Sequence, residues 1–193
     1  MNKGVFTRER ACVFCGASSG RNKNFQKTSK ELGKLLAKEK IDLVYGGGNS
    51  GLMGALANSV LTNGGKVIGV IPEFLKKFEA CHSGLSELIV TESMHKRKEK
   101  MYSLADYFII LPGGIGTIDE FSEIFTWSQL CLHSKACALL NVDGYYDAFL
   151  DFLNKAVEEN FISMEHFSSL IVCTMPDEVL KKCRDFKSTS AKK

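Results

Sequence analysis

One glycine-rich segment has the residue types and the spacing of an anion-binding active site. It runs from Pro112 to Glu120 (PGGIGTIDE) and follows an apolar run that is expected to form a buried strand. Gly113, Gly114 and Gly116 let the backbone approach a ligand closely. The N–H groups and the positive dipole end of the helix that follows favour a phosphate at this point. The carboxylate of Glu120, one helical turn further on, would be repelled there unless it had a catalytic task.

A second candidate lies in the basic stretch 93–105, which has the pattern of a helix. At about 100° per residue, Arg97 falls inside the apolar stripe and Lys98 on its flank, whereas Lys100 falls on the opposite side. An arginine in an apolar face requires an anionic partner, because an unpaired buried charge is costly. That partner could be a carboxylate with a purely structural role, or it could be Glu120.

The same test separates the acidic residues of the helix predicted at 117–132. Glu120 and Glu123 share one face with apolar residues. Asp119 falls on another face, where we expect it to be solvated or to support the start of the helix. Glu120 and Glu123 are therefore the acids predicted to point inward.

This helix also carries a second apolar stripe, formed by Phe121, Phe125 and Leu132. A helix that is apolar on two sides is either deeply buried or part of a subunit interface. For so small a protein the stripe predicts a homodimer.

Another glycine-rich turn, residues 46–54 (GGGNSGLMG), contains a formal G-x-G-x-x-G. This pattern is typical of dinucleotide-binding folds, but there it follows the first strand of the unit, and here it follows the second. Three interpretations stay open: a dinucleotide site, a site for another nucleotide or phosphate, and a tight turn without a ligand. If a ligand binds, the candidate contacts are Gly46, Gly47, Gly48 and Met53.

The elements that must position these residues alternate along the chain. Short apolar runs rich in Val and Ile are followed by segments of helical period, which predicts an α/β, Rossmann-like, doubly wound fold with a mainly parallel sheet of about seven strands. The predicted strands are 11–16, 41–45, 66–71, 88–91, 107–111, 136–141 and 170–174, and the predicted helices are 25–40, 51–62, 93–106, 117–132, 145–160 and 176–186. In such sheets ligands bind beyond the C-terminal ends of the strands, so we expect the loops 16–20, 46–51 and 112–117 to converge.

Length and charge limit the function classes. A chain of 193 residues with 45% apolar residues suits one domain, predicted at 1–186, with a solvated tail at 187–193. The net charge of +3 is small and dispersed, which argues against nucleic acid as a partner. No signal-peptide core or membrane-spanning run is present in the sequence, so we expect no membrane association and a cytoplasmic location.

The seven cysteines also favour a reducing compartment. Cys12, Cys131, Cys137 and Cys173 lie in apolar strand or helix patterns and are expected to be buried. No cysteine or histidine group has the spacing of a zinc site, so no metal is expected. Cys15 forms a C-x-x-C with Cys12, but the strand pattern around them argues against a redox pair.

Three segments together resemble the LONELY GUY family of cytokinin riboside 5′-monophosphate phosphoribohydrolases, long misnamed lysine decarboxylases. They are residues 45–54 (YGGGNSGLMG), 93–98 (SMHKRK) and 112–120. The likeness extends to residues 13–20, 65–72 and 140–146, in the same order and spacing. It is far more specific than any single glycine pattern.

The resemblance implies a Rossmann-like homodimer that hydrolyses the N-glycosidic bond of a nucleoside 5′-monophosphate, giving free base and ribose 5-phosphate without a cofactor. It implies Arg97 and Glu120 as the catalytic pair. The implied substrate contacts are Glu79, Arg97, Lys98, Gly114, Ile115, Gly116, Thr117, Ile118, Asp119, Glu120 and Thr126. The variable stretch 76–86 leaves the preferred base, a cytokinin-type or a plain purine, undetermined.

Other functions remain as alternatives. A non-catalytic carrier of a phosphorylated ligand, such as a molybdenum-cofactor carrier, would need the same fold and glycine loops, although the paired Arg97 and Glu120 favour an enzyme. A dehydrogenase would require the dinucleotide interpretation. A decarboxylase would require an electron sink held by an active-site lysine, and no lysine has a suitable pattern.

Overall fold

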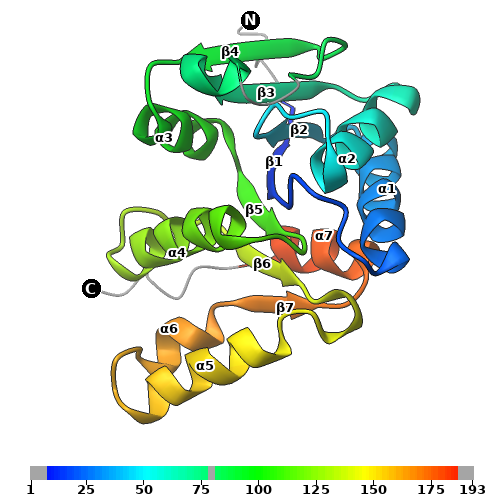
Figure 1. Ribbon diagram of the computed structural model, residues 1–193. Helices are drawn as coiled ribbons and strands as arrows, with labels where there is room; N and C mark the ends of the chain where they lie inside the picture. The colour runs from blue at the N-terminus through cyan, green and yellow to red at the C-terminus, as the bar shows by residue number, and fades with distance from the viewer. Residues whose placement is uncertain (1–7, 78–80, 187–193) are drawn as a thin grey trace, which may run out of the picture.

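A computed structural model describes residues 8–77 and 81–186. Its seven strands form one parallel sheet in the order β4-β3-β2-β1-β5-β6-β7 (Figure 1). The strands are β1 (Arg10–Phe14), β2 (Asp42–Tyr45), β3 (Val67–Pro72), β4 (Glu87–Thr91), β5 (Tyr107–Ile110), β6 (Cys137–Leu140) and β7 (Ile171–Cys173). The predicted α/β, Rossmann-like class and number of strands are thus confirmed.

Helices cover both faces of the sheet (Figure 1). One face carries α1 (Lys23–Lys38), α2 (Gly51–Thr62) and α7 (Pro176–Asp185), and the other carries α3 (Met94–Leu104), α4 (Ile115–Gln129), α5 (Asp147–Glu158) and α6 (Met164–Ser168). The described residues also contain two short 3-10 turns, η1 (Glu73–Lys77) and η2 (Val142–Gly144). The buried side chains form two apolar clusters, one on each side of the sheet. This arrangement explains why the central strands are apolar throughout and do not alternate.

The strand order places a switch point at β1. From this strand the chain builds outwards through β2 to β4, and it then returns to the other side of β1 with β5. The loops after β1 and β5 consequently diverge at the C-terminal edge of the sheet, where such folds bind ligands.

Helix ends agree with the sequence to within a few residues. The bounds of α2 are those predicted, and Gly64 closes this helix in the left-handed region at φ 76°, where its N–H donates to the Leu61 carbonyl. The five-residue helix α6 was not predicted, because so short a segment has no measurable period.

The apolar stripe predicted on α4 is covered within the chain at two of its three residues, and the burial predicted for Cys131 is wrong. The stripe residues Phe121 and Phe125 are buried in their own chain, where Phe121 stacks edge-on against Phe149 of α5 and Phe125 stacks on His166 of α6. A second subunit is therefore not needed to cover them. The helix also ends at Gln129, so Cys131 lies in a turn at φ 57° and is exposed.

Candidate active site

A cavity of about 470 Å³ opens where the three predicted loops meet. It lies beyond the C-terminal ends of β1, β2 and β5, as the switch point requires. Its wall is formed by Val13, Phe14, Cys15, Gly16, Ala17, Ser18, Ser19, Gly20, Phe25, Gly46, Leu52, Met53, Met94, Arg97, Pro112, Gly113, Gly114, Gly116, Thr117, Asp119, Glu120 and Tyr145. The predicted convergence of loops is thus confirmed.

Arg97 and Glu120 form a buried ion pair in the wall of this cavity. Arg97 Nη2 lies 3.4 Å from Glu120 Oε1, and the two side chains are 9% and 11% exposed. The Nε of Arg97 is buried and has no hydrogen-bond partner within the described chain. The inward position predicted for both residues is confirmed, and they are partners.

The place of Arg97 depends on Gly46 at the end of β2. A Cβ atom at this glycine would lie 2.2 Å from Arg97 Nη2. Any side chain there would displace the guanidinium. Gly46 thus contributes to the site by leaving room for the arginine.

The first turn of α4 has the geometry expected of an anion site. Gly114 is the N-cap, and no side chain caps the helix. The Thr117 N–H donates to the Gly114 carbonyl, whereas the N–H groups of Ile115 and Gly116 donate to no acceptor among residues 8–77 and 81–186. A Cβ at Gly114 or Gly116 would meet nothing within 4 Å, so both glycines face open space. Backbone donors at the positive end of a helix can bind a phosphate there.

The first turn of α2 has no such freedom. The Leu52 and Met53 N–H groups both donate to the Gly16 carbonyl, at 3.0 and 3.3 Å. A Cβ at Gly51 would lie 2.3 Å from Ala17 backbone atoms, and one at Gly54 would lie 2.2 Å from the Asn49 carbonyl. These contacts favour the tight-turn interpretation of the glycine pattern and leave no place for a dinucleotide phosphate.

The remaining candidates are divided between the cavity and its surroundings. Of the second glycine loop, Gly46 and Met53 line the cavity, while Gly47 and Gly48 are buried outside it. The candidates that do not line the cavity are Lys98, Ile115, Ile118 and Thr126. Glu79 lies outside the described residues.

Lys98 has carboxylate partners instead. Its Nζ lies 3.3 Å from Asp119 and 3.2 Å from Glu123, and its side chain is 12% exposed. Burial lowers the pKa of Lys98, but the bonds from Glu123 and Asp119 outweigh it, so the pKa is above its ordinary value. The lysine joins α3 to α4 beside the Arg97–Glu120 pair.

The cysteines do not form a redox pair. Cys12 and Cys15 pack into the clusters on opposite faces of the sheet. Burial, followed by the nearby Glu120 carboxylate, raises the pKa of the Cys15 thiol, so it stays protonated. Among residues 8–77 and 81–186, no three His, Cys, Asp or Glu side chains gather in a way that could hold a metal ion.

Two aromatic residues of the cavity were not predicted from the sequence. Tyr145 comes from the loop after β6 and Phe25 from the first turn of α1, and their rings meet edge to face at 5.2 Å. Tyr145 belongs to the segment 140–146, which the family resemblance had marked but to which no role was given.

Sequence comparison relates this chain to a known family. A family described as possible lysine decarboxylase matches residues 53–183. The probable cytokinin riboside 5′-monophosphate phosphoribohydrolase LOGL6 of Oryza sativa is 47% identical over 173 residues, which cover 90% of this chain and 69% of that protein. The cytokinin riboside 5′-monophosphate phosphoribohydrolase of Rhodococcoides fascians is 48% identical over 86% of this chain and 85% of its own length. This chain belongs to the cytokinin riboside 5′-monophosphate phosphoribohydrolase family.

Solved structures support the fold alone. The molybdenum cofactor binding protein of Rippkaea orientalis superposes with a TM-score of 0.70 at 19% identity, covering 93% of this chain and 98% of that one. The molybdenum cofactor carrier protein of Chlamydomonas reinhardtii gives 0.67 at 17% identity, covering 93% and 98%. The family's older description as a decarboxylase finds no chemical support here, because no lysine among the described residues lines the cavity.

Proposed function

We propose that this protein hydrolyses the N-glycosidic bond of a purine riboside 5′-monophosphate, of cytokinin type or plain, to the free base and ribose 5-phosphate. The observation that carries the proposal is the buried Arg97–Glu120 pair in the wall of a cavity that also contains the first turn of α4. The relatives named above are phosphoribohydrolases at almost half identity over most of this chain.

In the proposed reaction the oxygen of a water molecule forms a bond to C1′ of the ribose. The C1′–N bond breaks, its electron pair goes to the base, and the base leaves with one proton of the water. The sugar passes through an oxocarbenium-like state, whose positive charge a carboxylate can stabilise. Glu120 is the proposed group for this role and for orienting the water, and Arg97 holds its carboxylate in place.

The phosphate end of the substrate is proposed to bind the N–H groups at the start of α4. Its binding energy would then hold C1′ beside Glu120, so that contacts remote from the reacting bond contribute to the rate. The substrate contacts Gly114, Ile115, Gly116 and Thr117 all belong to this turn. Ile115 contributes through its backbone, since its side chain is 85% exposed and outside the cavity wall.

A carrier of a phosphorylated ligand shares this fold and would need the same helix turn. It would not need a carboxylate beside the phosphate, because an acid there weakens anion binding. The position of Glu120 therefore favours the enzyme.

A homodimer is also part of the proposal. Thr126 is exposed on α4 and does not line the cavity of its own chain. If it contacts substrate, it must reach the cavity of a second copy. Leu130 and Leu132, both 62% exposed beyond the end of α4, give such a contact an apolar part. Light scattering should give twice the mass of 21.3 kDa, and Leu132→Glu should halve it; a wild-type monomer with full activity would contradict the dimer.

We also place the protein in the cytoplasm. All seven cysteines are free thiols, and five of them are buried, which suits a reducing compartment. No helix in the described part of the chain is long and apolar enough to cross a membrane. Fluorescence microscopy of a tagged protein tests this location.

The function is tested by incubating the pure protein with a panel of nucleoside 5′-monophosphates and measuring the free base. We expect release from AMP or its N6-modified relatives, and a kcat/KM for the corresponding nucleoside lower by about two orders of magnitude, since the phosphate contacts are lost. Release of no base from any monophosphate would reject the proposal. Equal kcat/KM values for AMP and adenosine would reject the phosphate site.

A further inference from the structure

The segment 140–146 carries two tyrosines that bind the loop between β5 and α4. Tyr146 is buried, and its hydroxyl donates to the Leu111 carbonyl at 2.7 Å. Its own N–H donates to Asn141 Oδ1 at 2.7 Å, and the Asn141 amide donates to Asp147 at the start of α5. The segment is therefore fixed to the end of β5 at the residue next to Tyr145.

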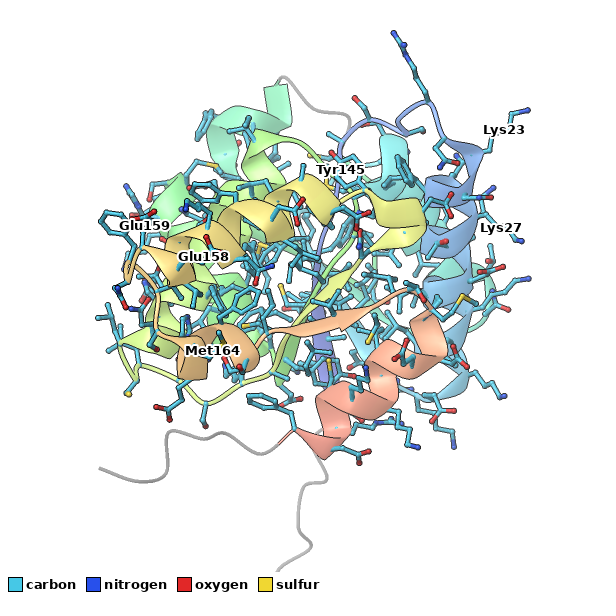
Figure 2. The ribbon with its side chains drawn as sticks, turned by 90° about the horizontal axis from the view of Figure 1, so that it is seen from below. Lys23, Lys27, Tyr145, Glu158, Glu159 and Met164 are labelled. Carbon is cyan, nitrogen blue, oxygen red and sulfur yellow. The ribbon has the colours of Figure 1, made fainter. Side chains whose placement is uncertain are left out.

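Tyr145 makes the next bond along the same loop. Its hydroxyl donates to the Gly113 carbonyl, two residues after the carbonyl that Tyr146 binds. Its ring is 43% exposed, lines the cavity and meets Phe25 edge to face. Figure 2 shows the residue where α5 begins, on the side of α1. Tyr145 is thus held by packing on one side and faces the cavity on the other.

The bond to Gly113 has a direct effect on the peptide that precedes α4. Because a trans peptide is planar, its C=O and N–H point in opposite directions. A hydroxyl that fixes the Gly113 carbonyl therefore also fixes the direction of the Gly114 N–H.

The Gly114 carbonyl accepts from the Thr117 and Ile118 N–H groups, which fix the peptide after this residue but not the one before it. Gly114 has no side chain, and a Cβ there would meet nothing within 4 Å. Glycine also has the widest choice of backbone conformation. The hydrogen bond from Tyr145 is an external contact that holds the peptide before Gly114.

We propose that Tyr145 is a positioning residue for the phosphate site: its hydroxyl, through the Gly113 carbonyl, orients the backbone donors at the start of α4. This inference rests on the proposed function, because it assigns a role within the same site. The proposed role belongs to the Tyr145 hydroxyl and not to its ring, so a phenylalanine at this position can test it.

The test compares Tyr145→Phe with Tyr102→Phe. Tyr102 is a matched control, because its hydroxyl donates to the Leu132 carbonyl at the opposite end of α4, away from the cavity. Calorimetric titration with ribose 5-phosphate and with adenosine, and steady-state kinetics with AMP, are measured for both variants and the wild type.

For Tyr145→Phe we expect a Kd for ribose 5-phosphate about 5- to 10-fold higher, the loss that one hydrogen bond typically causes. The KM for AMP should rise by a similar factor, with kcat within about twofold of wild type. The Kd for adenosine and the melting temperature should not change. Tyr102→Phe should leave all of these binding and kinetic values at their wild-type level.

Three results would overturn the inference. The first is an unchanged Kd for ribose 5-phosphate in Tyr145→Phe. The second is an equal loss of affinity for adenosine and ribose 5-phosphate, which would assign the effect to the cavity wall. The third is no binding of ribose 5-phosphate to the wild type. The proposed function fails on a different result, the absence of base release by the wild type. In that case the ribose 5-phosphate titrations still decide the role of Tyr145.

Discussion

Two turns of this protein have the same layout of strand, glycines and helix, yet they differ in what approaches the glycines. At the start of α2, the space beside Gly51 and Gly54 is filled by the chain itself, and the Gly16 carbonyl accepts from the Leu52 and Met53 N–H groups. At the start of α4, the space beside Gly114 and Gly116 is open. The first turn therefore uses glycine to pack backbone against backbone, and the second uses it to leave room for a ligand.

The comparison separates two causes of one sequence pattern. Glycine permits another atom to approach the backbone closely, but the sequence does not show whether that atom belongs to the protein or to a ligand. What decides is the destination of the helix N–H groups, which must be satisfied by the chain, by water or by a ligand. For α2 that destination is Gly16, from a loop more than thirty residues away in sequence.

The largest expected effect belongs to the helix after the open turn. Glu120→Gln should lower kcat by about two orders of magnitude or more, because the amide cannot stabilise positive charge on the sugar. The variant should stay folded and bind ribose 5-phosphate, since the N–H groups of the turn are unchanged. Kinetics with AMP and a titration with ribose 5-phosphate check both statements.

Glu123→Gln is the matched control for this substitution. Glu123 lies one turn further along α4 and binds Lys98 outside the cavity wall. We expect its kcat to stay within about threefold of wild type, because Glu123 does not line the cavity and Lys98 keeps Asp119 as a partner. Near-normal turnover by Glu120→Gln, or equal losses in both variants, would reject the proposed mechanism.

A pair of glycine substitutions tests the comparison itself. Gly54→Ala should lower the free energy of unfolding by about 1–3 kcal/mol, because its methyl group would meet the Asn49 carbonyl. Gly116→Ala should not lower stability, since its methyl group would enter open space. It should instead raise the Kd for ribose 5-phosphate roughly tenfold by occupying ligand space, the scale of one lost hydrogen bond.

Urea unfolding and calorimetric titration of the two alanine variants give both quantities. A Gly54→Ala protein as stable as the wild type would show that the first turn can relax. Unchanged ribose 5-phosphate binding by Gly116→Ala would remove the ligand from the second turn.

The sequence predicted the helices and strands, and it predicted which side chains on them point inward. Seven strands, the helix α2 and the inward position of Arg97 follow from period and burial, which act over neighbouring residues. The sheet then brings Arg97 and Glu120 together, because the ends of parallel strands share one edge.

What the sequence did not predict depended largely on contacts made by distant parts of the chain. The period of α4 showed that Phe121 and Phe125 are on an apolar face, but not that α5 and α6 cover it. The hydrogen bond from Tyr145 to Gly113 joins residues 32 positions apart, and no local pattern indicates it. The exposure of Cys131 follows from the early end of the helix, a boundary that period defines poorly.

A smaller effect is expected at Gly46, which follows β2 and lies against Arg97. Gly46→Ala would place a methyl group on the Arg97 guanidinium without touching the open turn. We expect kcat to fall about tenfold, as Glu120 loses the partner that orients it, while the Kd for ribose 5-phosphate stays unchanged. Lys100→Ala, on the exposed side of α3, is the control and should be silent. Loss of ribose 5-phosphate affinity in Gly46→Ala would mean that Arg97 binds the phosphate instead.

The smallest effect concerns how the helix of the open turn is held at its far end. The ring of His133 bonds to the Ile124 carbonyl, and His166 stacks on Phe125. Burial lowers the pKa of both histidines below the ordinary value of 6.5. The unfolded chain therefore binds more protons than the folded one just below this pH, so their contribution to stability is complete above about pH 6.5 and falls as the solution becomes more acidic.

Acid should consequently loosen α4 before α2. Hydrogen exchange at pH 7 and pH 5.5, expressed as protection relative to the unfolded chain, should show protection falling for the amides of α4 while those of α2 change less. In the double variant His133→Gln, His166→Phe the histidines no longer titrate, and the difference between the two pH values should disappear from α4. Equal loss of protection in α2 and α4 would show that acid acts on the whole fold, and that the two helices differ at their glycine turns alone.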